Sequence, residues 1–390
     1  MKKICFIVSS PATAKAFLER HIETLSEYYE IYLVANQIDS LLQNYANPNL
    51  KEIKHIKILR NVSIINDVMA LLSLTKYLRH NKFDLVISFT PKAGLIGMLA
   101  AFLAGTKRRV HFFTGQVWHT KSGLQRKALI LIDKLVVKLT TAILLDSFPQ
   151  QQFLIDNGIL SNENSQVLGK GTISGIDAEK FKPDALKRHE MRNKFGFTDE
   201  DFVVLFLGRL NTDKGVYDLL EAYYDLHNLY PNSKLVFAGP DEERVQQKYL
   251  NSGMVSKSIN FIGPVDNPQD IFLMADVFCL PSHREAFGLS VLEASACGIP
   301  VICSDTYGLL DTMLDYKTGL RHETGNIESL KNALIILRKD PNLRITLGQN
   351  GKDFVKDHFS QKILIELWKE FIFAILQDKN THSAQKKIRK

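Results

Sequence analysis

Two carboxylates eight positions apart, Glu285 and Glu293, are the side chains of this chain whose spacing most directly suggests chemistry. They lie in residues 282–305, SHREAFGLSVLEASACGIPVICSD, where a polar turn, an Ala/Leu/Val-rich helical run and a β-branched strand follow one another. Glu285 falls in the expected loop and Glu293 about one and a half turns into the expected helix. Gly288 stands at the expected start of that helix, where free N–H groups attract anions. The stretch therefore predicts a phosphate site.

The spacing of the two carboxylates argues against a hydrolase acid/base pair. Such a pair needs carboxyl groups about 5 to 9.5 Å apart, whereas eight residues of continuous helix rise about 12 Å. Unless the loop folds back, the better interpretation is two hydroxyl-holding carboxylates on one phosphate-bound ligand, one for a ribose diol and one for a transferred group. The alternative is that Glu285 is an exposed loop charge and Glu293 a solvated helix charge.

Two cations follow another expected strand. The apolar run Phe202–Leu207 predicts a strand buried on both faces, and Arg209 and Lys214 come directly after it, where a doubly wound sheet binds ligands. Arg209 could hold two phosphate oxygens as a fork, and Lys214 could neutralise another as a point charge. A solvated basic loop is the alternative. Because both residues lie in a loop, truncating them is expected to leave the melting temperature nearly unchanged.

The stretch EAFGLSVLE resembles the E-x7-E motif of glycosyltransferase family 4, the retaining GT-B enzymes that use nucleotide-sugar donors. The similarity extends over residues 203–320 in order and spacing, through Gly208-Arg209-Leu210 with Lys214-Gly215, Phe261-Ile262-Gly263-Pro264-Val265, and ADVFCLPS at residues 275–282. The resemblance implies a GT-B fold, in which two Rossmann-like, doubly wound α/β domains face each other across a cleft.

The resemblance also assigns roles to individual side chains. Glu285 would position the sugar, Arg209 and Lys214 would stabilise the leaving diphosphate, and the turn at Val265 would lie against the nucleotide base. The expected donor-binding residues are Arg209, Lys214, Val265, Glu285, Phe287, Gly288, Leu289 and Glu293. The expected catalytic residues are Glu285, Arg209, Lys214 and His119.

Three places depart from the family pattern. Residues 9–12, Ser-Ser-Pro-Ala, replace the usual glycine-rich turn after the first strand, and residues 307–311, Tyr-Gly-Leu-Leu-Asp, replace a Gly-Gly-x-x-Glu segment that bears on donor-sugar preference. A His-Gly pair common after the Arg109–Phe113 strand is Gly115-Gln116 here. His119 is therefore a candidate by proximity alone, and His111, within the strand, is expected to be a core residue.

Length and alternating strand and helix patterns indicate two soluble α/β domains in the 390 residues. The expected first domain is 1–182 and the expected second, nucleotide-sugar-binding domain is 183–360. The polar, Lys-rich stretch from about residue 183 to residue 201 is expected to connect the two. By resemblance, a helix at 361–378 crosses back onto the first domain. A basic tail, 379–390, ends the chain.

Charge is unevenly placed along the chain. Residues 1–182 hold 23 basic and 14 acidic side chains, and residues 183–390 hold 26 and 28. The basic portion suits an anionic partner such as a membrane surface or a lipid-linked pyrophosphate, and nucleic acid ranks last because no nucleic-acid motif accompanies the charge. The longest apolar run, residues 93–105, is shorter than the about 20 residues that span a bilayer. With no signal peptide visible, a cytoplasmic protein, peripheral on the inner membrane face, is expected.

Cysteine usage and acidic motifs give no indication of a metal. Cys5, Cys279, Cys297 and Cys303 sit in apolar contexts without metal-ligand spacing and are expected to be buried thiols. The one D-x-D, at residues 199–201, precedes a strand and reads as linker charge. No metal or other cofactor is expected.

Together with the family resemblance, which implies retention, these features predict a retaining glycosyltransferase. It would move a sugar, hexosyl or N-acetylhexosaminyl, from a nucleotide-sugar, with UDP the expected carrier, to a hydroxyl of a polyprenyl-diphosphate-linked saccharide in capsule, O-antigen or exopolysaccharide synthesis. Two alternatives stay open. One is a nucleotide-sugar 2-epimerase of the same fold, and the other is a catalytically silent nucleotide-sugar-binding protein.

Overall fold

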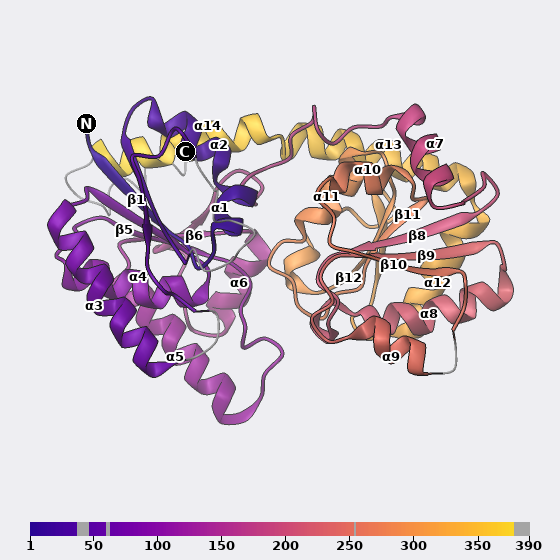
Figure 1. The fold of residues 1–390 in the computed structure, drawn as a ribbon, viewed down its shortest axis with the longest axis horizontal. Helices are drawn as coiled ribbons and strands as arrows, with labels where there is room; N and C mark the ends of the chain where they lie inside the picture. The colour runs from indigo at the N-terminus through magenta and orange to yellow at the C-terminus, as the bar shows by residue number, and fades with distance from the viewer. Residues whose placement is uncertain (37–46, 60–62, 253–254, 378–390) are drawn as a thin grey trace. The chain divides into compact units, whose positions relative to one another are not determined.

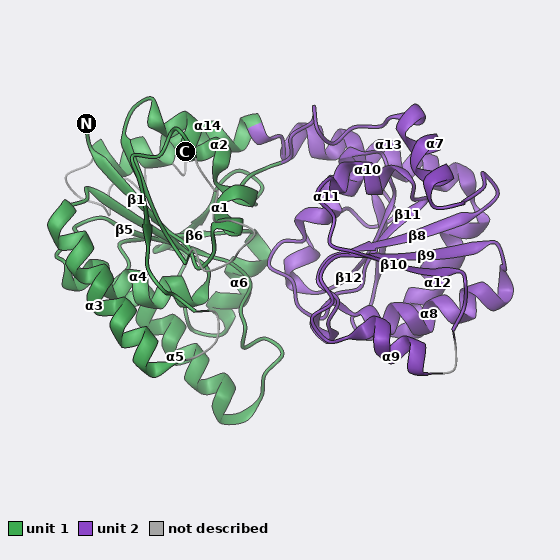
Figure 2. Ribbon diagram, viewed as in Figure 1, with its two compact units in different colours: residues 1–175, 362–390 green, residues 176–361 purple. Residues whose placement is uncertain are grey.

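The computed structural model describes residues 1–36, 47–59, 63–252 and 255–377 (Figure 1). The chain divides into two compact units, the first formed by Met1–Gly175 with the chain from Lys362 onward and the second by Ile176–Gln361 (Figure 2). The basic tail predicted for residues 379–390 lies outside the described residues.

The first unit is built on a seven-stranded, wholly parallel sheet of order β3-β2-β1-β4-β5-β6-β7. Its strands are β1 Lys3–Ile7, β2 Glu30–Ala35, β3 Glu52–His55, β4 Leu85–Phe89, β5 Arg109–Phe113, β6 Ala142–Leu145 and β7 Ser165–Val167. Its helices are α1 Pro11–Phe17, α2 Glu19–Ser26, α3 Ile64–Asn81, α4 Pro91–Leu103, α5 Gly123–Leu139, α6 Phe148–Asp156 and α14 Gln361–Gln377. Strand order reverses between β1 and β4, so the sheet is doubly wound.

Both faces of this sheet are buried around its central strands, which explains why β1, β2, β4 and β6 read as nearly continuous apolar runs. Cys5 and Ile7 of β1 pack into one core cluster with α3, α4 and α5, whereas Ile4 and Phe6 pack into the other with α2 and α14. Figure 1 shows α3, α4 and α5 together on one side of the sheet.

The second unit is a six-stranded parallel sheet of order β10-β9-β8-β11-β12-β13 around a single core. Its strands are β8 Phe202–Leu207, β9 Ser233–Ala238, β10 Ile259–Gly263, β11 Val277–Leu280, β12 Val301–Ser304 and β13 Gly319–His322. Its helices are α7 Ala185–Lys194, α8 Val216–Leu229, α9 Val245–Asn251, α10 Pro268–Leu273, α11 Leu289–Ala296, α12 Ile327–Lys339 and α13 Pro341–His358. The predicted pair of doubly wound α/β units is confirmed.

The division between the units falls at Gly175, seven residues before the predicted end of the first domain. Ile176 forms a parallel bridge with Ser360, and its N–H donates to the Phe359 carbonyl at 2.7 Å. Ile176 and Phe181 both pack in the core of the second unit. The segment after Gly175 therefore belongs to the second unit because its apolar side chains are buried there.

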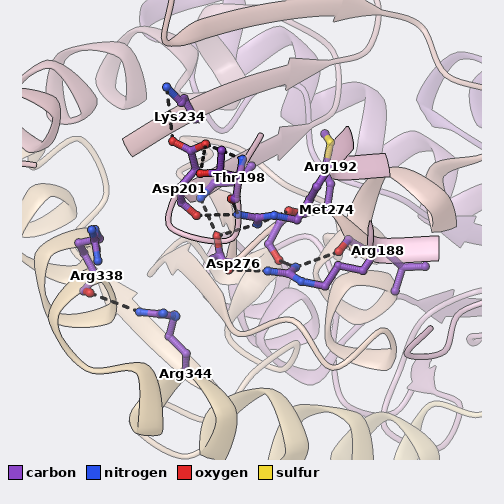
Figure 3. Close-up of polar contacts among 12 residues, drawn as sticks. Arg188, Arg192, Thr198, Asp201, Lys234, Met274, Asp276, Arg338 and Arg344 are labelled. Carbon is purple, nitrogen blue, oxygen red and sulfur yellow. Dashed lines mark hydrogen bonds and ion pairs between the residues drawn. The ribbon is translucent and has the colours of Figure 1, made fainter. Parts of the chain in front are cut away.

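The stretch predicted as a connection, residues 183–201, is also part of the second unit. Its helix α7 presents Arg188 and the buried Arg192 to Asp276, which lies just before β11, with N–O distances of 2.7 and 3.2 Å (Figure 3). Asp276 also accepts the backbone N–H of Val203 at 2.7 Å. These bonds tie α7 to β8 and to the start of β11. Asp201, the second acid of the D-x-D motif, accepts from the Thr198 N–H at 2.7 Å, as a structural turn residue does.

The last described helix, α14, packs on the first unit. Trp368, Phe371, Ile372 and Ile375 lie in one of its cores, and Arg108 Nε donates to the Ile375 carbonyl at 2.8 Å. The apolar run at residues 93–105 forms most of α4, which is largely buried rather than exposed. Among the described residues, no helix is both long and apolar enough to cross a membrane.

Candidate functional site

The candidate site lies where the strand order of the second unit reverses. β8 and β11 are neighbours at the centre of the sheet, and the chain leaves them in opposite directions. Doubly wound sheets bind ligands at this point, outside the carboxyl ends of the strands. The loop after β8 carries Arg209 and Lys214, and the loop after β11 carries Glu285.

Several bonds fasten these two loops to each other. The carbonyl of Asp213 accepts the backbone N–H groups of His283 and Arg284 at 2.9 and 3.1 Å. The Arg284 guanidinium also donates twice to the Asp213 carboxylate, at 2.7 and 3.0 Å. These bonds join segments about seventy residues apart in the chain into one surface. This Asp213–Arg284 pair was not predicted from the sequence, because neither residue belongs to the motifs.

Two glycines permit the close approach of the backbones. Gly215 has φ of +68°, and a Cβ there would lie 2.0 Å from the Pro281 carbonyl oxygen. A Cβ on Gly308 would lie 2.1 Å from the carbonyl oxygen of Glu285. No side chain fits at either position, so the loops around Glu285 pack backbone against backbone.

Lys214 and Glu285 form an ion pair at the centre of this surface. Only 13% and 12% of the two side chains is exposed, and the Ser282 hydroxyl also donates to the Glu285 carboxylate at 3.3 Å. The sequence assigned these residues to different parts of one ligand. The structure brings their charged groups into direct contact.

Arg209 is paired too, but on the surface. Its guanidinium lies 3.0 Å from the carboxylate of Glu242, and the two side chains are 32% and 34% exposed. Asn211 Nδ2 donates to the same carboxylate at 2.7 Å. Sequence reasoning missed Glu242. Its position shortly after β9, at the same sheet edge as Arg209, was the available signal.

The N-terminus of α11 completes the site. Gly288 precedes it with φ of +64°, and no side chain caps the helix end. Leu289 is the first helical residue, and its N–H faces outward along the helix axis, as the first N–H groups of a helix do. This end of α11 follows Glu285 by a few residues and offers the partial positive charge that an anion requires.

Glu293 sits in a different environment from Glu285. It lies within α11, and burial raises the pKa of its carboxyl from an ordinary 4.5 to about 7, an effect that the positive charge of Lys180 partly offsets. Glu285 instead neighbours a cation within contact distance. The two carboxylates are therefore not equivalent chemically.

The remaining predicted residues are distributed more widely. The ring of Phe287 is buried in the core, with its centroid 5.7 Å from that of Phe359. Val265 follows the edge strand β10 and packs partly against the same core. His119 lies in the first unit, after β5, with its ring edge-on to Phe153 at 5.1 Å.

His111 is a core residue, as predicted. It is buried, its Nδ1 lies 2.8 Å from the Ser88 hydroxyl, and burial lowers the pKa of its imidazole to about 3. A Cβ on Gly94 would lie 2.4 Å from the ring, so α4 packs tightly over it. All four cysteines are free and buried.

Two cavities among the described residues lie elsewhere. One, of about 350 Å³, is lined by residues of β13 and α12, and the other, of about 190 Å³, by residues at the amino ends of β4 and β5. Within the described part of the chain, no group of three or more His, Cys, Asp or Glu residues could hold a metal ion.

Comparison with known proteins matches the second unit to one family. The profile of "Glycosyl transferases group 1" covers residues 187–354. Over longer stretches the chain is 30% identical across 340 residues to the capsular polysaccharide biosynthesis glycosyltransferase CapM of Staphylococcus aureus, which covers 86% of this chain and 88% of CapM. It is 28% identical to the Escherichia coli UDP-Gal:alpha-D-GlcNAc-diphosphoundecaprenol alpha-1,3-galactosyltransferase, with 86% of each chain covered.

Solved structures share the fold at low identity. HepE of Anabaena, solved in complex with UDP and glucose, superposes with a TM-score of 0.79 at 18% identity, over 96% of this chain and all of HepE. Sucrose-phosphate synthase of Thermosynechococcus elongatus gives 0.78 at 19% identity, with the same coverage. Both are GT-B glycosyltransferases in architecture, and the GT-B fold is thereby confirmed.

Proposed function

Since the chain belongs to the group 1 glycosyl transferases, we propose that it is a retaining, family 4 type enzyme that transfers a sugar from a UDP-sugar to a lipid-linked saccharide. The acceptor would be a hydroxyl of a polyprenyl-diphosphate-linked saccharide in the synthesis of capsule, O-antigen or exopolysaccharide. The observation that carries the proposal is the Lys214–Glu285 pair beside the uncapped start of α11.

The geometry suits a sugar diphosphate. Arg209 and Lys214 follow β8 and the start of α11 follows β11, so a guanidinium, an ammonium and a helix N-terminus all lie in loops at the carboxyl edge of the sheet. When the bond between the sugar and the diphosphate breaks, charge accumulates on the departing oxygen, and preorganised cations stabilise that state more than the ground state. In this arrangement Lys214 neutralises the diphosphate, and Glu285, fixed by the same pair, accepts a hydrogen bond from a hydroxyl of the sugar.

The remaining donor contacts follow from position. Arg209 reaches the diphosphate by exchanging Glu242 for phosphate oxygens, since its ion pair is exposed. Glu293 holds the ribose, and the backbone beyond β10 at Val265 lies against the base. His119 is the candidate for the acceptor side, because it follows β5 at the carboxyl edge of the first sheet.

Relatives support the choice of acceptor class. The E. coli relative is named for a diphosphoundecaprenol-linked GlcNAc acceptor, and a Campylobacter jejuni relative, 27% identical over 71% of this chain, for a diphospho-undecaprenol-linked bacillosamine derivative. A long polyprenyl chain resides in a membrane. We accordingly place the enzyme at the inner face of the cytoplasmic membrane.

Transfer can be tested directly with purified protein. UDP, GDP and ADP sugars are first ranked by the rise in melting temperature that each produces, because a bound ligand stabilises the fold by mass action. The best donor is then incubated with and without a short-chain polyprenyl-diphosphate saccharide, and the products are read by mass spectrometry and by the anomeric proton signals in NMR. Retained anomeric configuration and donor consumption only with acceptor support the proposal.

Each alternative gives another outcome of the same assay. A 2-epimerase converts the donor without acceptor, and a silent binding protein shifts the melting temperature but consumes nothing. Inverted configuration would remove the retaining, family 4 assignment. We propose further that no metal is needed, because Lys214 and Arg209 supply positive charge to the diphosphate; activity that is abolished by EDTA and restored by Mg²⁺ or Mn²⁺ would contradict this.

A further inference from the structure

The outer surface of α5 in the first unit combines exposed leucines with exposed lysines. Leu124, Leu131 and Leu135 lie at spacings of seven and four residues, so they share one face of the helix, and all three are exposed. A single exposed apolar side chain is common on soluble proteins, but a contiguous row of them indicates an interaction surface.

Each of these leucines is followed three residues later by a lysine. Lys127, Lys134 and Lys138 are exposed and stand next to Leu124, Leu131 and Leu135 on the helix surface. The one acid of α5, Asp133, is buried and accepts a hydrogen bond from Trp118 Nε1 at 2.7 Å. The exposed charge of this helix is therefore wholly positive.

A second exposed apolar row lies on α3, on the same side of the sheet (Figure 1). α4 packs between α3 and α5, and Lys92 of α4 pairs with Asp67 of α3 at 2.8 Å. This ion pair neutralises Asp67, the one acidic residue in the first turn of α3. The exposed apolar residues of α3 are Ile64, Ile65, Val68, Met69 and Leu72.

We propose that this α3–α5 surface, defined by the exposed apolar residues of α3 and α5 and the three α5 lysines, inserts into the headgroup region of an anionic lipid bilayer. Apolar side chains flanked by lysines on one helix face fit an anionic bilayer surface. The lysine ammonium groups can remain with the lipid phosphates while the leucines enter the boundary of the acyl chains. The same surface of a second copy of the chain would carry the same positive charge, so the two surfaces would repel each other.

The inference deepens the proposed function, because it names the surface by which the enzyme would meet a lipid-linked acceptor. It also changes the sequence-based expectation of binding through charge alone, which fades as the Debye length falls from about 10 Å at 0.1 M to 3 Å at 1 M salt. With the leucines inserted, a fraction of the binding persists at 1 M salt.

Depth of insertion can be measured at single positions. Because the four native cysteines are buried, Leu124→Cys and Leu131→Cys can be labelled selectively with a polarity-sensitive fluorophore. Leu186→Cys on α7 of the second unit is the matched control, since Leu186 is 86% exposed and Leu124 is 84% exposed. With phosphatidylcholine vesicles containing phosphatidylglycerol, the first two labels shift to the blue and the control does not.

Affinity gives an independent measurement. In vesicle flotation, the triple variant Lys127→Gln/Lys134→Gln/Lys138→Gln binds on the order of 100-fold more weakly, about fivefold for each lysine. Leu131→Ser weakens binding about 10-fold. The control triple Lys194→Gln/Lys339→Gln/Lys356→Gln, which removes exposed lysines of the second unit, leaves binding unchanged.

Three results would overturn the inference. They are failure to bind anionic vesicles at about 0.1 M salt, equal weakening by the two triple variants, and a label at position 124 that stays unshifted on bound protein. Dimerisation by light scattering that is lost in Leu131→Ser would assign the surface to a second copy instead. The vesicles contain neither donor nor acceptor, so transfer to a water-soluble acceptor analogue without vesicle binding would refute this surface and leave the proposed enzyme activity intact.

Discussion

Truncation of Lys214 and truncation of Arg209 are expected to differ in their effect on stability, although both residues lie in one loop. Lys214→Ala leaves the Glu285 carboxylate, 12% exposed, without its cation, whereas Arg209→Ala releases a carboxylate that is 34% exposed. The expectation from the sequence was that neither change would move the melting temperature. The ion pairs alter that expectation for Lys214.

The magnitude follows from burial. Removing one partner of a fully buried ion pair costs about 3 to 5 kcal/mol. Because Glu285 keeps some solvent contact and the Ser282 hydroxyl bond, we expect Lys214→Ala to lower the free energy of unfolding by about 1 to 3 kcal/mol. In a unit of this size each kcal/mol shifts the melting temperature by about 2 to 4 °C, which gives about 2 to 12 °C. An exposed ion pair contributes about 0 to 1 kcal/mol to the free energy of unfolding, so Arg209→Ala should lower the melting temperature by at most about 4 °C.

Differential scanning calorimetry of the unliganded protein measures these shifts. The set is Lys214→Ala, Glu285→Ala, their double variant and Arg209→Ala as the matched control. Since the double variant leaves no unpaired charge, its loss should fall short of the sum of the single losses by about 0.5 to 3 kcal/mol. A Lys214→Ala protein that melts with the parent, or additive single losses, would refute the buried-pair reasoning.

The same variants also test catalysis. At a temperature where all are folded, Lys214→Ala and Arg209→Ala should each lower kcat about 100- to 1000-fold, the cost of one preorganised charge partner of a developing anion. Lys214→Arg should retain only part of the parent kcat, because a planar guanidinium cannot replace a compact ammonium. Near-normal turnover in both alanine variants would remove the phosphate site from the proposed function.

Three further predictions concern the carboxylates around the site. Glu242→Gln should tighten UDP binding up to about fivefold, as measured by calorimetric titration, because Arg209 loses its competitor; weaker binding would mean that Glu242 positions Arg209 instead. Burial raises the pKa of Glu293 to about 7 from 4.5, so the folded chain holds a proton that the unfolded chain releases, and stability from this group is lost as pH rises from about 4.5 through 7. Glu293→Gln should flatten this part of the melting-temperature profile, and an unchanged slope would contradict it. Finally, Glu293→Ala should raise KM more than it lowers kcat, and Glu285→Ala should mainly lower kcat; matching kinetics would leave the two roles unsupported.

Much of the fold could be predicted because its signals are local. Runs such as Phe202–Leu207 are apolar throughout because parallel strands are covered on both faces, and Gly288 ends the loop before α11 because that position requires a positive φ. The boundary between the units could not be found this way. Residues 176–182 look polar and irregular, and their place depends on a bridge between Ile176 and Ser360, far apart in the sequence.

The partners of the cations were missed for the same reason. Motif spacing identifies Arg209 and Lys214 as positively charged loop residues. The partner of Arg209, Glu242, follows a different strand, and the partner of Lys214, Glu285, lies in the loop after β11. Only the order of strands in the sheet brings the three loops together at one edge. Sequence motifs identify the charged residues of a site, but which of those charges are neutralised by ion pairs depends on the three-dimensional fold.

That neutralisation constrains how a sugar diphosphate could bind. Both cations are paired with carboxylates in the unliganded chain. The binding free energy that each cation contributes to a diphosphate is therefore reduced by the cost of displacing, or sharing the cation with, that carboxylate. Arg209 can leave Glu242 at little cost because that pair is solvated. Lys214 cannot leave Glu285 cheaply, because the carboxylate would stay buried and unpaired. In the proposed enzyme the Lys214–Glu285 pair therefore stays closed, presenting its ammonium to the diphosphate and its carboxylate to the sugar on either side of the bond that breaks. Arg209 is then the cation that moves with each turnover.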